Sequence, residues 1–184
     1  MDKILGNLNL VLVIGLVAAL ALIFGTHGGL DPNLVLRWLH VFFGITWIGL
    51  LYYFNFVQIP TMPKVPAELK PAVSKFIAPA ALFYFRWAAV GTVVTGLLVA
   101  WVMGYVHEAL TLSAGYQLIG IGMWLALIMA LNVWVFIWPN QKRALGIVEA
   151  DDASKAKSAR LAMLFSRTNT LLSIPMLYAM ANFS

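Results

Sequence analysis

The chain has 184 residues, of which 62% are hydrophobic and 10% charged, with a formal net charge of +5. Soluble domains are about half apolar and about a quarter charged, and the apolar runs here are continuous rather than alternating, so the composition predicts an all-α integral membrane protein and excludes a β-barrel. The absence of cysteine excludes disulfides, iron–sulfur clusters and a covalently attached c-type haem.

Five apolar stretches are long enough to cross a bilayer, since a span needs about 20 residues with a rise of about 1.5 Å each. We therefore predict a single domain over residues 1–184, with five transmembrane helices in one bundle. The predicted spans are 8–24, 34–57, 80–105, 116–138 and 161–183. No small-residue cleavage pattern follows the first span, so we expect a retained helix rather than a signal peptide.

Prolines define the predicted loops on one side of the membrane. Residues 58–79 contain Pro60, Pro63, Pro66, Pro71 and Pro79, a density that predicts a loop with at most a short surface helix over 72–77. For the same reason we expect Pro139 to end the fourth span.

The basic residues lie in alternate connections. Lys3, the 58–79 loop and the 140–160 loop carry them, whereas residues 25–33 and 106–115 have no lysine or arginine. The positive-inside rule then predicts a multi-pass protein with a cytoplasmic amino terminus and a carboxyl terminus on the outer side of the membrane. The positive charge is explained by topology and anionic lipid, so we expect no nucleic-acid partner.

His40 is an ionisable residue inside a predicted span, which marks a candidate site. It lies about six residues, or about 9 Å, below the outer end of its helix. Gly44 and Trp47 share its face. A neutral imidazole, a small residue where a flat ring can pass, and an aromatic wall suit a b-type haem, with His40 on the iron. Arg37 then meets a haem propionate or extends outward to the lipid headgroups.

A second haem ligand has to come from the outer half of the membrane. His107, just after the third span, is the first candidate and His27 the next. The alternative is that His40 only forms a hydrogen bond with a neighbouring helix, and that the loop histidines are solvated.

A second polar group is predicted at the inner ends of four helices. Guanidinium and amide groups form paired hydrogen bonds in one plane, which suits a planar or anionic molecule such as a substrate or a quinone headgroup. The alternative is that the arginines extend to lipid headgroups while the amides cap helix ends. We expect this site to lie most of a membrane thickness from His40. Its residues are Asn55, Gln58, Arg86, Arg167 and Asn169, with Asn132, Asn140 and Gln141 nearby.

Three stretches together resemble a known family. They are Trp38–Gly49, Asn132–Lys142 and Ser166–Tyr178, of which the second is the most specific. They resemble the urate oxidase N-terminal domain family, whose members include membrane-bound bacterial urate hydroxylases with a terminal cytochrome c domain. The Leu39-His40…Thr46-Trp47 pattern is also similar to the small membrane haem proteins that oxidise protoporphyrinogen.

The resemblance implies an inner-membrane redox protein that passes electrons from a small substrate to a cytochrome c. This chain has no Cys-x-x-Cys-His, so we expect no cytochrome domain of its own. Thr168 stands where the family motif has histidine, and Thr170 where it has asparagine. Two functions stay open: a haem-binding redox protein, which if an enzyme is an oxidoreductase, and a non-catalytic accessory subunit of a larger membrane complex.

Overall fold

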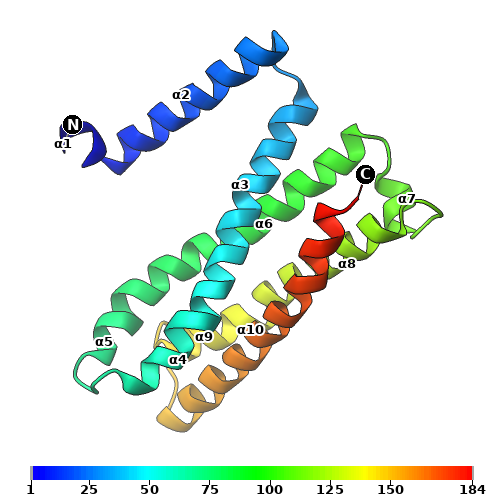
Figure 1. The fold of residues 1–184 in the computed structure, drawn as a ribbon. Coiled ribbons are helices and arrows are strands. Elements are labelled where there is room, and N and C mark those ends of the chain that lie inside the picture. Colours follow the sequence, from blue (N-terminus) through cyan, green and yellow to red (C-terminus); the bar gives the residue numbers. More distant parts are fainter. Residues whose placement is uncertain (1, 184) are drawn as a thin grey trace.

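The computed structural model describes residues 2–183 and contains helices and connecting turns but no strands over that range (Figure 1). The principal helices are α2 (Leu8–His27), α3 (Pro32–Tyr52), α6 (Ala78–Val102), α8 (Gln117–Asn132) and α10 (Asp152–Ala181). Shorter elements are α1 (Asp2–Leu5), α4 (Ile59–Thr61), α5 (Lys70–Ala72), α7 (Val106–Leu110), α9 (Trp138–Ala144), the π-helical η1 (Tyr53–Gln58), η3 (Val73–Ile77) and η4 (Val133–Ile137), and the 3₁₀ turn η2 (Met62–Lys64).

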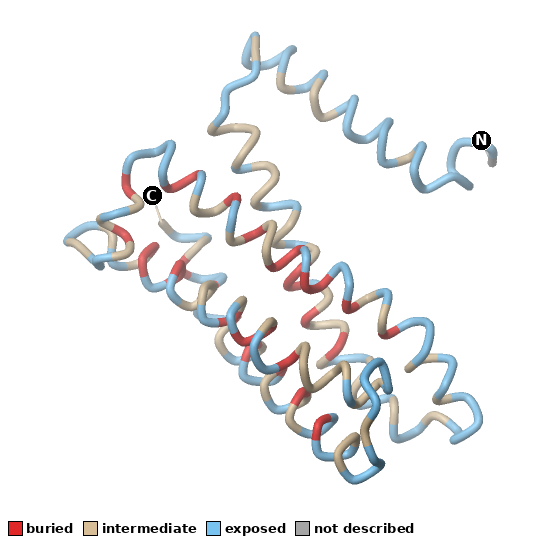
Figure 2. Tube along the Cα trace, turned by 180° about the vertical axis from the view of Figure 1, so that it is seen from behind, coloured by how far each residue is buried: buried red, intermediate tan, exposed pale blue. Residues whose placement is uncertain are grey.

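Four long helices pack together lengthwise. Helix α3 runs antiparallel to α6, and α8 runs antiparallel to α10 (Figure 1). The buried residues lie along the contact between these helices (Figure 2). The larger core cluster surrounds Trp47, Phe85 and Met129, and a smaller one lies around Tyr105 and Met123 near the carboxyl terminus. A four-helix arrangement of this kind positions residues from all four helices around the space between the two pairs.

Helix α2 lies apart from these four (Figures 1 and 2). It has no buried residue. The prediction of five helices in one bundle is therefore wrong for this structure, because only four pack against one another. Helix α2 is apolar all round, so no face of it is marked for burial against the other helices. Its ends are nevertheless defined, since Asn7 Oδ1 accepts a hydrogen bond from the Leu10 N–H and Gly28 takes the left-handed conformation with φ 72°.

Within residues 2–183, four continuous helical segments are long and apolar enough to cross a membrane. They are Leu8–His27, Pro32–Lys64, Lys70–Val102 and Gln117–Ala144. Helix α10 is not among them. It begins at Asp152, earlier than the predicted 161, with Asp151 as its N-cap, and its middle carries the polar run Ser166–Thr170. The two middle segments extend well beyond the predicted spans.

These extensions pass through the prolines that were expected to break the helices, so the prediction of a 58–79 loop is wrong over much of its length. Pro60, Pro79 and Pro139 each follow a π-helical segment by two residues. The residue before each proline donates its N–H to the carbonyl five residues earlier: Ile59 to Phe54, Ala78 to Val73, and Trp138 to Val133. Such a widened turn accommodates the proline ring and its missing N–H, so the helix continues.

Candidate functional site

A cavity of about 580 Å³ lies between α3, α6, α8 and α10. This volume falls in the range of small-molecule and cofactor sites, about 300–1,000 Å³. Its wall is mainly apolar, with a few polar groups. Four residues predicted for the haem site, Arg37, His40, Gly44 and Trp47, are among those that line it.

The imidazole of His40 is oriented by helix α6. Its Nδ1 lies 2.9 Å from the carbonyl oxygen of Thr92. A carbonyl can only accept, so Nδ1 carries the hydrogen and donates it. Thr95 Oγ1 lies at 3.4 Å but already donates to the Gly91 carbonyl at 2.6 Å. Among the described residues none forms a hydrogen bond with Nε2, so in a neutral imidazole that donates through Nδ1 this second nitrogen keeps a free lone pair. Metal-binding histidines are commonly fixed in this way, with one ring N–H on a carbonyl and the other nitrogen available.

The other predicted wall residues leave space for a ligand. A β-carbon added at Gly44 would meet only Thr92 Cγ2, at 3.9 Å, so the space beside His40 is open at this glycine. Trp47 is fully buried, and its indole N–H has no hydrogen-bond partner among the described residues. Arg37 lies one turn before His40, is exposed, and lines the outer end of the cavity.

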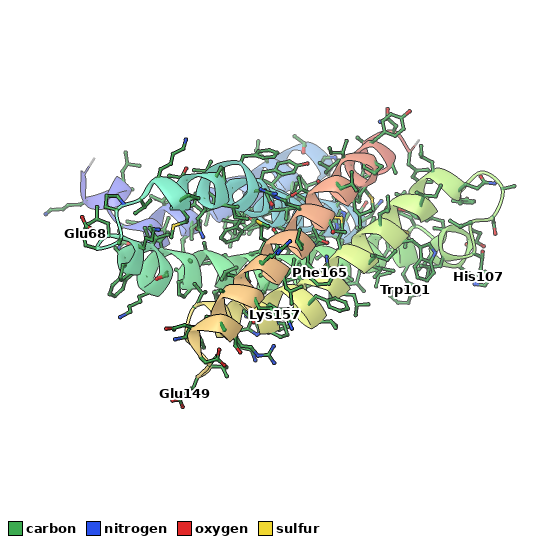
Figure 3. The ribbon with its side chains drawn as sticks, turned by 90° about the horizontal axis from the view of Figure 1, so that it is seen from below. Glu68, Trp101, His107, Glu149, Lys157 and Phe165 are labelled. Atoms are coloured by element: carbon green, nitrogen blue, oxygen red, sulfur yellow. The ribbon has the colours of Figure 1, made fainter. Side chains whose placement is uncertain are left out.

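The structure does not bring the predicted second histidine to this cavity. His107 lies on α7, is exposed, and points outward at the end of the molecule (Figure 3). His27 is the last residue of α2, away from the four packed helices. Within residues 2–183 no three His, Asp or Glu side chains are grouped to hold a metal ion. Of the three histidines, His40 alone lies at this cavity among the described residues.

The predicted inner polar group divides into two parts, and the first is a hydrogen-bond network between helices. Asn55 Nδ2 donates to Ser166 Oγ at 2.8 Å. Asn132 Nδ2 donates to Asn169 Oδ1 at 2.7 Å, and Asn169 Nδ2 donates to the Met129 carbonyl at 3.0 Å. Asn169 is fully buried. Hydrogen bonds of this kind, formed by side-chain amides between helices, hold apolar helices in register.

The second part consists of a buried cation and two glutamines, each with polar atoms that have no hydrogen-bond partner among the described residues. Arg86 is 8% exposed, and its Cζ lies 3.4 Å from the centroid of the Trp138 ring. Neither its Nε nor its Nη1 has a hydrogen-bond partner among the described residues. Gln58 Oε1 and Gln141 Oε1 are likewise unpaired, and both glutamines line a small cavity of about 130 Å³. Such unpaired buried groups are costly, so they point to a bound polar molecule or water.

Arg167 does not join this second part, because it is exposed on the surface of α10. The two sites lie at different depths. The His40 ring lies over Gly96, which is ten positions, or about 15 Å along the helix axis, from Arg86. Gln58 follows His40 by eighteen positions, or about 27 Å, so it is the part of the inner group most distant from His40.

Residues 89–183, just over half of the chain, match the family model described as urate oxidase N-terminal. The chain belongs to the urate oxidase N-terminal family. No curated protein and no solved structure matches the chain.

The urate oxidase N-terminal match contains two of the three stretches that carried the resemblance, Asn132–Lys142 and Ser166–Tyr178. It also contains Thr92, which orients the imidazole. The Trp38–Gly49 stretch with His40 lies outside the matched range, as does Arg86. The family match thus covers most of the hydrogen-bond network between the helices, whereas His40 and Arg86 lie outside it.

Sequence reasoning missed the methionines of the cavity. The thioether side chains that line it are Met103, Met123, Met176 and Met180. Met176 and Met180 are four positions apart, so they share one face of α10, and this spacing is the signal that could have found them.

Proposed function

We propose that this chain is a multi-pass membrane redox protein in which His40 ligates a b-type haem. The observation that carries the proposal is the Nδ1 hydrogen bond of His40 to the Thr92 carbonyl, which leaves Nε2 without a hydrogen-bond partner among the described residues, on a side chain that lines the cavity of about 580 Å³. A b-type haem needs a neutral imidazole as a ligand to its iron and apolar walls around its porphyrin ring. When bound, haem supplies one-electron transfer.

The chain's own residues have separate tasks in this proposal. His40 donates its Nε2 lone pair and is held in one tautomer by Thr92. Gly44 leaves room for the ring edge, and Trp47 closes the cavity against the inner half. Arg37, at the exposed outer end, pairs with carboxylate groups of the cofactor, because a guanidinium fork matches carboxylate geometry.

The membrane placement is part of the proposal. Four helical segments have the length and composition to span a bilayer, and α10, which packs against α3 and α8, is the fifth span. The basic residues at the ends of these segments favour a cytoplasmic amino terminus. Arg37 and His40 then lie toward the periplasmic side, where a cytochrome c accepts electrons.

The inner group supplies the electron-donor site in this scheme. The unpaired Nε and Nη1 donors of Arg86 and the unpaired Oε1 acceptors of Gln58 and Gln141 are available to a small planar or anionic substrate or a quinone headgroup.

The test is the visible spectrum of the purified protein before and after dithionite reduction. The proposal predicts a Soret band and α/β bands in the wild-type protein and in His107→Ala, and their loss in His40→Ala. A folded wild-type protein without haem in a pyridine haemochrome assay overturns the proposal.

A second function, a non-catalytic accessory subunit, is favoured by a different observation. Helix α2 is apolar all round and has no buried residue, which suits a helix that docks against another membrane subunit. This alternative predicts a colourless protein in which single cysteines introduced along one face of α2 cross-link to one defined subunit. Cross-linking spread evenly around α2 contradicts it.

A further inference from the structure

A tyrosine lines the outer end of the large cavity. Tyr105 follows α6 and borders this cavity together with Arg37. Its side chain is 9% exposed, and its hydroxyl forms no hydrogen bond with any described residue. A phenol buried to this degree usually has a hydrogen-bond partner, so the hydroxyl is available to a polar group of a ligand in the cavity.

Contacts between α3 and α6 set the depth at which Arg37 lies. The His40 ring lies over Gly96, and a β-carbon at Gly44 would lie 3.9 Å from Thr92 Cγ2. A step of four residues along α3 is thus matched by a step of four residues back along α6, as in an antiparallel pair. Arg37, three positions before His40, is therefore level with the residue three positions after Gly96.

That residue is Val99, and the end of α6 brings Tyr105 back to the same level. Gly104 takes the left-handed conformation with φ 79°, and the Tyr105 N–H donates to the Ala100 carbonyl at 3.0 Å, as in a Schellman motif. The backbone of Tyr105 is therefore bonded to the neighbour of Val99, at the depth of Arg37.

The Tyr105 ring is held in place by two other aromatic rings. Tyr116 stacks on it with centroids 5.8 Å apart, and Phe183 packs in an edge-to-face arrangement with centroids 5.3 Å apart. Burial raises the pKa of the Tyr105 phenol above its ordinary value, and the positive charge of Arg37 opposes that shift. The guanidinium therefore lies close enough to act on the phenol.

We infer that Tyr105 binds the carboxylate groups of the cofactor together with Arg37, by donating a hydrogen bond from its phenol. The inference rests on the proposed function, because the ligand is the haem held by His40. Arg37 has no ion-pair partner within residues 2–183, so it is free to pair with a carboxylate. A phenol that is already fixed by its neighbours loses little freedom on binding, and its hydrogen bond to a charged acceptor is stronger than one to a neutral acceptor.

The test is the rate at which the haem-loaded full chain in detergent loses its cofactor to excess apomyoglobin, measured for protohaem and for protohaem dimethyl ester, in which both carboxylates are blocked. The inference predicts that Tyr105→Phe loses protohaem roughly tenfold faster than the wild type, as expected for one charge-assisted hydrogen bond, with an unchanged visible spectrum. The ester leaves both proteins at the same rate. Tyr116→Phe is the control, because it removes a hydroxyl from the same aromatic cluster at a residue that does not line the cavity. It should keep the wild-type rate.

The outcomes separate this inference from the proposed function. A Tyr105→Phe protein that retains protohaem as well as the wild type, or that loses protohaem and the ester faster by the same factor, overturns the role of Tyr105 and leaves the His40 haem in place. The same acceleration in Tyr116→Phe also overturns it, because packing of the aromatic cluster would then account for the effect. A wild-type protein without haem overturns the proposed function and this inference together.

Discussion

The imidazole of His40 lies so close over Gly96 that a β-carbon at this glycine would sit 2.7 Å from the ring Cε1 and 3.0 Å from Nδ1. Glycine is thus what allows the ring to reach the Thr92 carbonyl. Gly91, five positions earlier, has the same relationship to the Phe43 ring, with a closest approach of 2.7 Å. The two glycines give a matched pair, since only one of them contacts the histidine.

Gly96→Ala is expected to displace the imidazole and abolish haem binding. Overpacking of this kind costs about 1–3 kcal/mol of stability. Gly91→Ala is the control, because it overpacks α3 against α6 by a similar amount without contacting His40. Haem content and thermal unfolding in detergent measure the two effects. Equal haem loss in both variants contradicts a specific role of Gly96 in placing the ring.

Gly44→Ala tests whether the space beside His40 is used. The added methyl group meets only Thr92 at 3.9 Å, so the fold tolerates it. It enters the cavity, however, and we expect weaker haem retention at unchanged or slightly higher thermal stability, since alanine favours a helix over glycine by about 1 kcal/mol. Haem retention during dilution checks this; undiminished retention shows that the ring does not pass Gly44.

Asn169→Ala is expected to destabilise the packed helices by about 1–3 kcal/mol, because it leaves Asn132 without one buried partner. Asn182→Ala is the control. Asn182 also donates to a backbone carbonyl, that of Tyr178, but it is exposed, so its loss costs less than about 0.5 kcal/mol. Thermal unfolding of both variants gives the comparison, and equal midpoints are incompatible with the network holding α8 to α10.

Arg86→Lys is expected to impair the proposed electron-donor site without changing the haem site. A lysine keeps the charge but loses the planar stack on Trp138 and the paired donors. Reduction of the haem by a quinol or substrate should fall roughly tenfold or more, since charge-assisted hydrogen bonds contribute about 1.5–3 kcal/mol. The haem spectrum should not change. Arg143→Lys, at an exposed position of α9, should leave the rate unaltered.

Asp151 predicts a pH dependence at the start of α10. Its carboxylate accepts hydrogen bonds from the Ser154 N–H at 2.7 Å and the Ser154 hydroxyl at 2.8 Å, and the backbone bond, then the hydroxyl bond, hold its pKa below the ordinary value. With a lowered folded-state pKa, the cap is fully stabilising above the unfolded pKa and is lost as pH falls through the folded one. The protection factor of the Ser154 amide against hydrogen exchange, relative to the intrinsic rate at the same pH, should therefore fall in acid, and Asp151→Asn should remove that pH dependence of the protection.

The sequence predicted helices but misplaced their ends, for a definable reason. Closely spaced prolines normally break a helix, yet here each of Pro60, Pro79 and Pro139 follows a π-helical turn that accommodates the proline and its missing N–H. The helix propensities of single residues do not predict that a π-helical turn precedes a proline. Helix α2 was predicted from its length and apolar composition. Because it is uniformly apolar, however, its sequence does not indicate whether it packs against the other helices.

The candidate site was predictable where residues share one helix. His40, Gly44 and Trp47 lie on one face of α3, and all three line the cavity. The partners on other helices were not predictable, because helix pairing decides them. Arg167 was grouped with Arg86 by depth alone but is exposed, while the methionines of the cavity carry no charge, and only the spacing of Met176 and Met180 marked them.

The most direct test of the account is the amount of haem per chain in purified wild-type protein and in His40→Ala, measured side by side on folded, detergent-solubilised samples. The account predicts haem in an equimolar ratio to the wild-type chain and none in the variant. Haem-free wild-type protein, or equal haem in both samples, contradicts it.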